Sequence, residues 1–327
     1  MERNTSGVLP RIRVAVLAGG DSSERAVSLE SGAAVTSALA DRGHTVTPID
    51  PAQDGFDGTD WSRFDVAFLA LHGRFGEDGQ VQTLLGSAGI PYTGSDAETS
   101  RLAFSKSASK ERFLQCGVPT LPYVLIHESD PAARIAQQAK KLGFPLVVKP
   151  DRQGSSVGVS IVRGAQELPA ALSRCFAHDA FGILEPAVVG SEWTVGVIDD
   201  LLLPAIEIET DRAFFDYDAK YADEATRYRF DYSATPEVVR AIEIAGRKAA
   251  AALGTRGIAR ADLMLDAQQR PWVLEVNTIP GFTSHSLVPK AAARIGISFG
   301  ELCERAVQSA LAAAAARTAE TAMRKAG

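Results

Sequence analysis

Arg260-Ala-Asp-Leu-Met-Leu265 and Trp272-Val-Leu-Glu-Val-Asn277 are two short, largely apolar stretches joined by Asp-Ala-Gln-Gln-Arg-Pro. Alternate residues of a strand point to the same face, and each stretch carries polar residues two positions apart. We therefore expect two paired strands of one sheet. A single acidic residue would be an ordinary side chain on the solvent face of a strand. Four polar residues in phase on two paired strands instead predict a site.

The expected hairpin aligns two carboxylates and an amide. Arg260 and Asp262 share one face of the first strand, and Glu275 and Asn277 share a face of the second. If the register sets Asp262 opposite Glu275, two like charges meet, which destabilises the sheet unless a cation lies between them. Carboxylate and amide oxygens are hard ligands, which Mg²⁺ takes together with nucleotide phosphates. The hairpin therefore predicts a magnesium–nucleotide site.

Size and composition limit the classes of function. The chain has 327 residues, enough for two or three domains. Its net charge of −6 provides no basic field for nucleic acid or an anionic membrane. No stretch approaches the roughly 20 apolar residues that span a bilayer, and the polar start lacks the apolar core of a secretion signal. We expect a cytoplasmic protein without nucleic-acid or membrane partners.

The first hundred residues are typical of an open α/β layer. Apolar strands are expected at 13–18, 45–49 and 65–71, with a helix at 22–42 after the first strand. Ligands of such sheets bind beyond the carboxyl ends of the strands, where Gly19-Gly20 and the segment 72–79 lie. No GxGxxG follows the first strand, so a dinucleotide site is not expected.

The remaining chain divides into a smaller α+β unit and a strand-rich unit. The smaller unit is expected to contain the following elements: helix 105–116, strand 123–126, helix 131–142, strand 146–149, glycine loop 153–158, strand 159–162, helix 167–176 and strand 182–185. A strand-rich region follows from about 193, then helix 236–253, the hairpin, helices from 289 and an Ala-rich end at 310–327. The predicted domains are 1–103, 104–191 and 192–327.

A glycine loop, Gly154-Ser-Ser-Val-Gly158, follows Lys149 at a strand end. Glycines let backbone N–H groups approach phosphate oxygens, and serine hydroxyls add donors. The loop is not a Walker motif, and a simple hairpin turn explains it equally well in isolation. Lys106 and Lys149 are candidate phosphate contacts, and Lys149 is the more constrained because it closes an apolar strand.

Glu24 and His72 each permit two interpretations. Glu24 follows Asp21 by three residues, which is the spacing of a helix capping box. Alternatively, its carboxylate holds a ligand ammonium, and the two roles are compatible. His72 follows a buried strand, where it either pins the next loop or contacts a substrate and moves a proton. The placement of His72 favours function.

Two later segments complete the candidate site. Gly281-Phe-Thr-Ser-His-Ser-Leu-Val-Pro289 leads from the hairpin into a helix, and its N–H groups suit an anion. Ordinary N-capping by a hydroxyl of this segment is the alternative. Residues 215–221 are typical of a long loop, the class from which lids come, and would bring Lys220 and Tyr221 over the site.

Taken together, these segments resemble the D-alanine–D-alanine ligases of the ATP-grasp superfamily over roughly 13–306. The resemblance rests on the order and spacing of motifs at 19–32, 71–79, 91–94, 149–158, 216–221, 274–281 and 283–287. It implies α/β and α+β domains in a three-domain ATP-grasp architecture, with an N-terminal open parallel α/β domain. It also implies ATP-dependent joining of two D-alanines through an acyl phosphate, for the peptidoglycan precursor.

The resemblance assigns substrate roles to the candidates. Glu24 matches the anchor for the first D-alanine ammonium, with Ser155 and Tyr221 as its hydrogen-bonded companions. His72 lies near the second subsite. Arg260 and the Gly281 N–H match the oxyanion hole. Ser286 and the Leu287 N–H match the groups that bind the carboxylate of the second D-alanine.

The same resemblance assigns the nucleotide and metal contacts. The matching ATP contacts are Lys106, Lys149, Ser156, Glu185, Glu192 and Lys220, with Glu185 on the adenine amine and Glu192 on the ribose. The matching ligands of two Mg²⁺, with Mn²⁺ as a substitute, are Asp262, Glu275 and Asn277. A homodimer through the first domain is also implied.

The chain departs from the family pattern at two places. Ser105 stands where Asp commonly precedes the lysine, which bears on how Lys106 is oriented. Pro186-Ala187-Val188 stands where an aromatic residue is common, at the expected adenine contact. Tyr221 favours the dipeptide, because ester-forming relatives usually carry Phe there. The rivals are a related ligase with a D-lactate or D-serine acceptor and a catalytically dead nucleotide-binding homologue.

Overall fold

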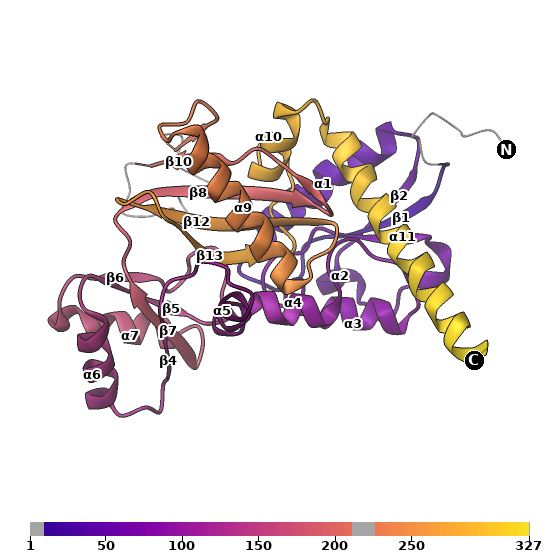
Figure 1. The fold of residues 1–327 in the computed structure, drawn as a ribbon. Coiled ribbons are helices and arrows are strands. Elements are labelled where there is room, and N and C mark those ends of the chain that lie inside the picture. The colour runs from indigo at the N-terminus through magenta and orange to yellow at the C-terminus, as the bar shows by residue number, and fades with distance from the viewer. Residues whose placement is uncertain (1–9, 211–225, 327) are drawn as a thin grey trace.

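The computed structural model describes residues 10–210 and 226–326 and contains three β-sheets in chain order (Figure 1). The predicted lid with Lys220 and Tyr221 lies outside these described residues. The three sheets match the three units expected from the sequence, whereas the exact domain boundaries stay predictions. No helix within the described ranges combines the length and apolar character needed to cross a membrane.

The first sheet is parallel, with strand order β2-β1-β3. Its strands and first helix are β1 (Arg13–Leu17), α1 (Arg25–Asp41), β2 (Thr45–Ile49) and β3 (Val66–Leu69). Four of the five β1 residues are buried, as a central parallel strand requires. The open parallel α/β layer expected from the sequence is confirmed. Helix α1 begins at Arg25 rather than at 22, because Ser23 and Glu24 form a turn before it, closed by the Arg25 N–H on the Ser22 carbonyl.

Short helices connect this sheet to the next unit, and the sequence analysis did not predict them. They are α2 (Pro51–Asp54), α3 (Gln80–Ser87) and α4 (Ala97–Phe104), together with the 3₁₀ turn η1 (Trp61–Arg63). Asp96 caps α4 by accepting a hydrogen bond from the Thr99 N–H. This capping signal is visible in the sequence, but the apolar period of an eight-residue helix is too short to identify it.

The middle sheet is antiparallel, with strand order β4-β7-β5-β6. Its elements are α5 (Lys106–Gln115), β4 (Val124–His127), α6 (Ala132–Leu142), β5 (Leu146–Pro150), β6 (Ser160–Val162), η2 (Ala165–Glu167), α7 (Leu168–Phe176) and β7 (Phe181–Pro186). Helices α6 and α7 share one apolar core with β5 and β7. The elements expected here are confirmed to within two residues.

The third sheet has strand order β11-β10-β8-β12-β13, and helix α9 packs on β8, β12 and β13. Its elements are β8 (Gly190–Ile198), β9 (Leu201–Leu202), β10 (Ile206–Glu209), β11 (Arg227–Arg229), α9 (Pro236–Leu253), β12 (Ile258–Asp266) and β13 (Pro271–Asn277). Figure 1 shows this sheet above the middle one, with α9 along one face. The expected hairpin is therefore β12–β13, at one edge of the sheet.

The end of the chain returns to its beginning. Helices α10 (Leu287–Arg294) and α11 (Phe299–Ala326) follow the hairpin, and α11 packs on α1 and β3 (Figure 1). Val16 and Phe68 of the first sheet share one core with Val288 and Leu302 of these helices. The first and third units are thus joined by common packing, whereas the middle sheet has a core of its own.

Glu304 of α11 fastens this junction. It is 2% exposed, pairs with Arg42, and lies 3.2 Å from His44 Nε2. The Arg42 hydrogen bond outweighs burial and lowers the pKa of Glu304. The ionised carboxylate therefore stabilises the fold above its unfolded pKa of about 4.3, and this stabilisation is lost as pH falls through the lower folded pKa.

Glu304→Gln is expected to reduce the free energy of unfolding at pH 7 by about 2 kcal/mol, because it removes the charge from the hydrogen bond between the buried Glu304 and the partly exposed Arg42. Urea denaturation measures this, and the difference from the unmodified chain should shrink below about pH 4. Glu301→Gln is the matched control, since Glu301 pairs with Arg305 on the same helix with both side chains about two-fifths exposed. It should cost less than about 0.5 kcal/mol. Equal losses of unfolding free energy in the two variants would contradict the stabilising role of Glu304.

Candidate functional site

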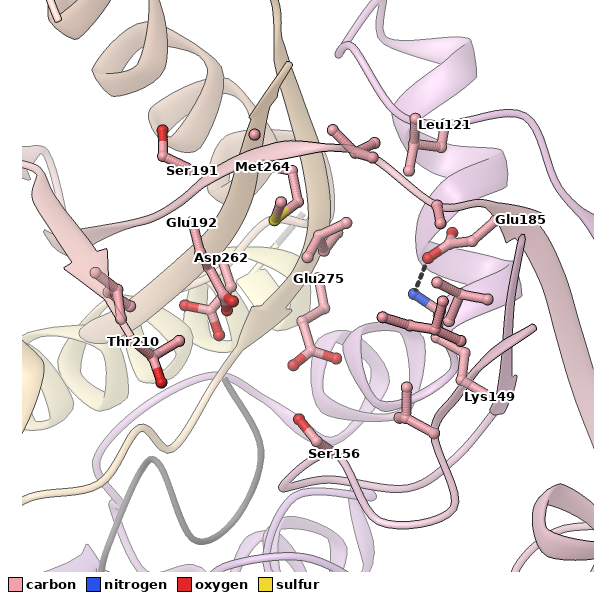
Figure 2. Close-up of a pocket in the computed structure, with 18 of the residues that line it drawn as sticks. Leu121, Lys149, Ser156, Glu185, Ser191, Glu192, Thr210, Asp262, Met264 and Glu275 are labelled. Atoms are coloured by element: carbon pink, nitrogen blue, oxygen red, sulfur yellow. Dashed lines mark ion pairs between the residues drawn. The ribbon is translucent and has the colours of Figure 1, made fainter. Parts of the chain in front are cut away.

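A cavity of about 760 Å³ lies between the middle sheet and the third sheet (Figure 2). Residues from both sheets line it. The predicted site residues among them are Lys106, Lys149, Ser156, Glu185, Glu192, Asp262 and Glu275. Apolar side chains of Leu121, Met264 and Leu274 lie in the same cavity. A slot with apolar walls and converging charges suits a flat ring attached to an anionic tail.

The hairpin register that the prediction required is confirmed. Asp262 is paired with Glu275, and Arg260 with Asn277. The register shifts directly after Asp262, so Leu274 is an extra residue without an opposite partner. This bulge turns two consecutive residues, Leu274 and Glu275, into the cavity. One irregularity therefore supplies both an apolar contact and a carboxylate.

Each hairpin carboxylate is paired with a basic side chain of its own. Arg260 donates two hydrogen bonds to Asp262, of 2.8 and 2.7 Å. Lys106 Nζ lies 2.9 Å from Glu275 Oε2. These pairs offset the repulsion between the two neighbouring carboxylates.

The oxygen donors of the hairpin fit a hard cation. Asn277 donates its Nδ2 to Asp262 Oδ2 at 3.1 Å, which leaves the amide oxygen available to a ligand. Thr194 Oγ1 also donates to Asp262, at 2.7 Å, and fixes the orientation of that carboxylate. Across residues 10–210 and 226–326, no three His, Cys, Asp or Glu side chains form a metal cluster by themselves. The set here is two carboxylates and one amide, the chemistry that Mg²⁺ takes with phosphate oxygens.

The predicted phosphate lysines enter the cavity from the middle unit. Lys149 Nζ pairs with Glu185 Oε1 at 2.5 Å (Figure 2). Lys106 Nζ donates to the Gln153 carbonyl at 2.7 Å. All three charged side chains are at most 8% exposed by residue. Burial favours the neutral form of Glu185, but Lys149 and Lys110 outweigh it and lower the pKa of this carboxylate. Glu185 is thus held as a charged carboxylate among buried lysines.

The glycine loop brings its two serines to two different places. Ser155 and Ser156 both have left-handed backbones, with φ of 51° and 57°. Such conformations cost free energy and cluster at functional sites. Ser156 lines the large cavity, and Ser155 Oγ donates a short hydrogen bond to Glu24. The loop therefore connects the nucleotide cavity to the first unit.

Glu24 does not act as part of a capping box. It is the N-cap residue of α1, but its side chain makes no capping bond, and its own N–H bonds to Ser22 Oγ at 3.2 Å. Instead the carboxylate, in a residue 6% exposed, accepts the Ser155 hydroxyl. The capping interpretation of Glu24 is therefore wrong, whereas the binding of a ligand ammonium by its carboxylate stays a prediction. Glu24 also lines a second cavity of about 460 Å³.

Gly73 leaves the room in which Glu24 lies. A Cβ built on Gly73 would be 2.8 Å from Glu24 Oε2, and its φ of +71° is left-handed. We expect Gly73→Ala to displace Glu24. If Glu24 holds a substrate ammonium, as the sequence predicts, KM for that substrate should rise about tenfold, the loss of one charged hydrogen bond. Gly117→Ala is the matched control, because Gly117 has φ of +66° and open space. In steady-state kinetics, the KM of Gly117→Ala should equal that of the wild type. An equal rise of KM in both variants would show that the contact with Glu24 is not its cause.

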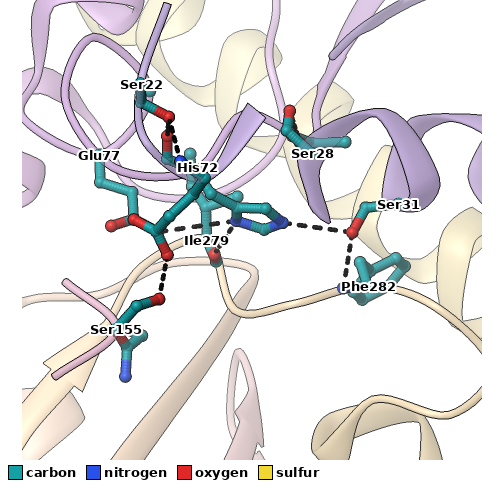
Figure 3. A network of polar contacts seen from close by, with 12 residues as sticks. Ser22, Ser28, Ser31, His72, Glu77, Ser155, Ile279 and Phe282 are labelled. Carbon is teal, nitrogen blue, oxygen red and sulfur yellow. Dashed lines mark hydrogen bonds and ion pairs between the residues drawn. The ribbon is translucent and has the colours of Figure 1, made fainter. Parts of the chain in front are cut away.

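His72 connects the first unit to the segment after the hairpin (Figure 3). Its Nδ1 lies 3.1 Å from the Ile279 carbonyl, and its Nε2 lies 3.2 Å from Ser31 Oγ. Ser31 Oγ also accepts the Phe282 N–H at 3.3 Å. Both ring nitrogens therefore have partners, and His72 holds the segment after the hairpin against the first unit. A contact with substrate stays a prediction.

The segment after the hairpin places Ser286 at the start of α10. Ser286 Oγ accepts the Thr283 N–H at 3.0 Å and makes no capping bond to the helix. Ordinary capping by Ser286 is therefore not observed. Gly281 lies close to it, since a Cβ on Gly281 would be 3.3 Å from Ser286 Oγ. The helix begins at Leu287, so the Leu287 N–H is in its first turn, where N–H groups have no intrahelical acceptor.

The two departures from the family pattern have local explanations. Ser105 caps α5 by accepting the Ala108 N–H at 3.3 Å, and its hydroxyl donates to Asp151 at 2.8 Å. Lys106 therefore keeps an ordered start of helix without an aspartate before it. The Ala187 N–H donates to the Pro145 carbonyl at 3.0 Å, so this N–H is engaged within the protein.

Sequence reasoning missed three charged residues of this region: the buried Lys110 and Glu207, and the partly buried Glu77. Glu77 Oε1 lies 3.7 Å from His72 Nδ1, and burial raises the pKa of Glu77. Glu207 lines the large cavity and accepts the Ser233 N–H at 3.0 Å. Lys110 pairs with Glu185. Glu77 lies in the quoted segment 72–79, whereas nothing local distinguishes Lys110 or Glu207 from surface charges.

Family models match two parts of this chain. The model described as D-ala D-ala ligase C-terminus matches residues 113–308, and the model described as D-ala D-ala ligase N-terminus matches residues 51–95. The first of these models covers the glycine loop, the hairpin and helix α10.

Similar proteins and structures carry the same description. The D-alanine–D-alanine ligase of Stutzerimonas stutzeri is 45% identical over 291 residues, 89% of this chain and 91% of that protein. The ligase of Gloeobacter violaceus is 41% identical and is covered completely, over 92% of this chain. The Bacillus anthracis ligase complexed with ATP has a TM-score of 0.82 and 32% identity, covering 94% of this chain and 99% of that one.

A structure with a different acceptor in its description is also similar. The VanG D-Ala:D-Ser ligase of Enterococcus faecalis has a TM-score of 0.80 and 29% identity, and 91% of this chain and 99% of that one are covered. The three-sheet fold is thus shared among ligases of different acceptors. With the family models and relatives above 40% identity over nine-tenths of the sequence, the chain belongs to the D-alanine–D-alanine ligase family.

Proposed function

We propose that this chain joins two D-alanines to D-alanyl-D-alanine at the expense of ATP, for peptidoglycan precursor synthesis. The observation that carries the proposal is the meeting of Lys106, Lys149, Asp262 and Glu275 in one cavity between two sheets. The relatives that are over 40% identical, which are D-alanine–D-alanine ligases, support it.

The chemistry solves the poor reactivity of a carboxylate. A carboxylate oxygen of the first D-alanine attacks the γ-phosphorus of ATP, the bond to the β-phosphate oxygen breaks, and ADP leaves. The product is an acyl phosphate. The deprotonated amine of the second D-alanine attacks the acyl carbon, and the tetrahedral oxyanion collapses with loss of inorganic phosphate. Each step moves negative charge, so fixed cationic donors are the main catalytic resource.

The residues take the roles that their positions suit. Glu24, held by Ser155, binds the ammonium of the first D-alanine. Lys106 and Lys149 exchange their carboxylate partners for phosphate oxygens. Arg260 and the Gly281 N–H stabilise the oxyanion, while Ser286 and the Leu287 N–H hold the second carboxylate. Glu185 and Glu192 bind adenosine.

Asp262, Glu275 and Asn277 would hold Mg²⁺, or Mn²⁺ as a substitute. The cation supplies neutralisation of phosphate charge and polarisation of the transferred group when bound. Glu275 and Asp262 then orient it, and Thr194 keeps Asp262 aimed at the cavity through its 2.7 Å hydrogen bond.

The decisive experiment is the reaction itself, with D-alanine, ATP and Mg²⁺ and identification of the product by mass spectrometry. We expect the D-alanine dipeptide, ADP and phosphate in equal amounts, with phosphate release dependent on D-alanine. Nucleotide binding without D-alanine-dependent phosphate release would favour a catalytically dead homologue.

A D-serine or D-lactate acceptor is the second candidate, favoured by the similarity to the D-Ala:D-Ser ligase structure. Competition between D-alanine and each alternative acceptor, with all products quantified, separates them. We expect the D-alanine dipeptide to predominate.

We also propose that the chain acts in the cytoplasm, where ATP is available. We further propose that it forms a homodimer through the first unit, and light scattering on the purified chain tests this.

A further inference from the structure

Lys110 is a lysine with no exposed surface. Its Nζ lies 2.9 Å from Glu185 Oε2, donates to Thr120 Oγ1 at 2.9 Å and donates to the Leu121 carbonyl at 3.2 Å. Lysines are almost never fully buried unless they are paired. All three partners lie at or near the wall of the nucleotide cavity, so the position is specifically built.

Helix α5 directs two ammonium groups to two different sheets. Lys106 and Lys110 are four residues apart and therefore share a helix face. Lys106 pairs with Glu275 of the third sheet, and Lys110 pairs with Glu185 of the middle sheet. One helix thus neutralises one carboxylate from each side of the cavity.

Glu185 lies between two lysines with different freedom. Lys149 pairs with Oε1 at 2.5 Å, and Lys110 with Oε2 at 2.9 Å. Lys110 therefore neutralises the carboxylate from its Oε2 side, and Lys149 from its Oε1 side. Lys149 lines the cavity, whereas Lys110 is fixed behind it by two further hydrogen bonds. When phosphate enters, Lys149 is the cation able to leave.

The anchor of Lys110 also touches the hairpin. Thr120 Oγ1 donates to the Val273 carbonyl of β13 at 2.9 Å, and the Val273 N–H donates to the Pro119 carbonyl at 2.8 Å. The segment around Thr120 is therefore paired with β13. Lys110 lies where the carboxylate of the middle sheet and the carboxylate hairpin of the third sheet meet.

We propose that Lys110 is a positioning residue for nucleotide selection, a fixed counter-charge that keeps Glu185 ionised and aimed at the purine amine while Lys149 turns to the phosphates. The proposal rests on the proposed function. Without Lys110, the departure of Lys149 would leave an unpaired buried carboxylate, which is strongly unfavourable. Glu185 would then retain Lys149 or take up a proton, and either outcome removes its preference for an amine donor.

The test compares ATP with inosine triphosphate, which has a carbonyl oxygen in place of the purine amine. In Lys110→Met, the ratio of kcat/KM for ATP to kcat/KM for inosine triphosphate should fall about tenfold or more, the factor that a hydrogen bond to a charged group supplies. KM for D-alanine should stay within about twofold of the wild-type value, because Lys110 contacts no element of the Glu24 site.

Thr120→Val is the matched control. It removes the hydrogen bonds of the Thr120 hydroxyl to Lys110 and to Val273 and keeps the Lys110 ammonium beside Glu185. It should reduce Tm and retain the nucleotide ratio. Lys149→Met provides a second test that does not depend on the folding of Lys110→Met. Lys110 should keep Glu185 ionised in that variant, so the preference for ATP should persist although KM for ATP rises.

The outcomes separate the two proposals. A wild-type chain without D-alanine-dependent turnover counts against the proposed function. An active wild type with an unchanged ratio in Lys110→Met overturns the role of Lys110. The role is equally overturned if Thr120→Val or Lys149→Met loses the ATP preference as completely as Lys110→Met does.

Discussion

Glu275→Gln is expected to lower kcat/KM for ATP by about 1,000-fold at low Mg²⁺, while far-UV circular dichroism remains unchanged. The glutamine keeps the shape of the side chain but removes one of two carboxylate ligands. The loss corresponds to the several kcal/mol of charge stabilisation that a bound cation supplies. The direct measurement is the Mg²⁺ concentration at half-maximal rate, which should rise strongly.

Lys106→Met is the matched variant, because Lys106 is the ion-pair partner of Glu275 at 2.9 Å. If Glu275 serves to hold a cation, Lys106→Met should raise KM for ATP without raising the Mg²⁺ requirement. If Glu275 served only to position Lys106, the two single variants and the double variant would behave alike. A Glu275→Gln enzyme with the wild-type Mg²⁺ requirement contradicts the ligand assignment.

Arg260→Ala should lower kcat about 100- to 1,000-fold and change the KM values by less than about threefold, as the removal of an oxyanion donor does. Arg260 is held by two hydrogen bonds to Asp262, and its side chain is only 12% exposed. Its charge is therefore in place before reaction, and in the proposed role it would act on charge that appears only in the transition state.

Arg260→Lys is the control for charge without geometry. A lysine keeps one positive charge but does not form the two-pronged bond to Asp262, so we expect an intermediate kcat. Steady-state kinetics with D-alanine and ATP varied separately give both parameters. A rise in KM alone, with kcat preserved, would reassign Arg260 to ground-state binding.

Sequence periodicity predicted the central hairpin because alternation and a short turn are local properties. The pairing of Asp262 with Glu275 does not follow from counting residues back from the turn, because that count sets Asp262 opposite Leu274. The bulge at Leu274 does not follow, since it depends on how β13 meets α5 and the segment around Thr120. The result is a second cavity-facing residue on β13 that strict alternation would direct to the opposite face.

The buried charges show the limit of local inference. Lys110 occurs in a helix of mixed polarity, Lys-Ser-Ala-Ser-Lys-Glu, where every lysine resembles a solvated one. Only the approach of Glu185, distant in sequence, makes its position special. Similarly, the capping-box spacing at Glu24 is real, but its carboxylate instead accepts a hydrogen bond from the hydroxyl of Ser155, 131 residues away. Such contacts are set by the meeting of the three sheets.

The central claim is that a D-alanine carboxylate is activated by phosphoryl transfer within the cavity between the middle and third sheets. Its most direct test uses D-alanine labelled with ¹⁸O in the carboxylate and mass analysis of the phosphate released with the dipeptide. We expect each phosphate to contain one ¹⁸O atom, transferred through the acyl phosphate. Unlabelled phosphate accompanying formation of the dipeptide would contradict the claim.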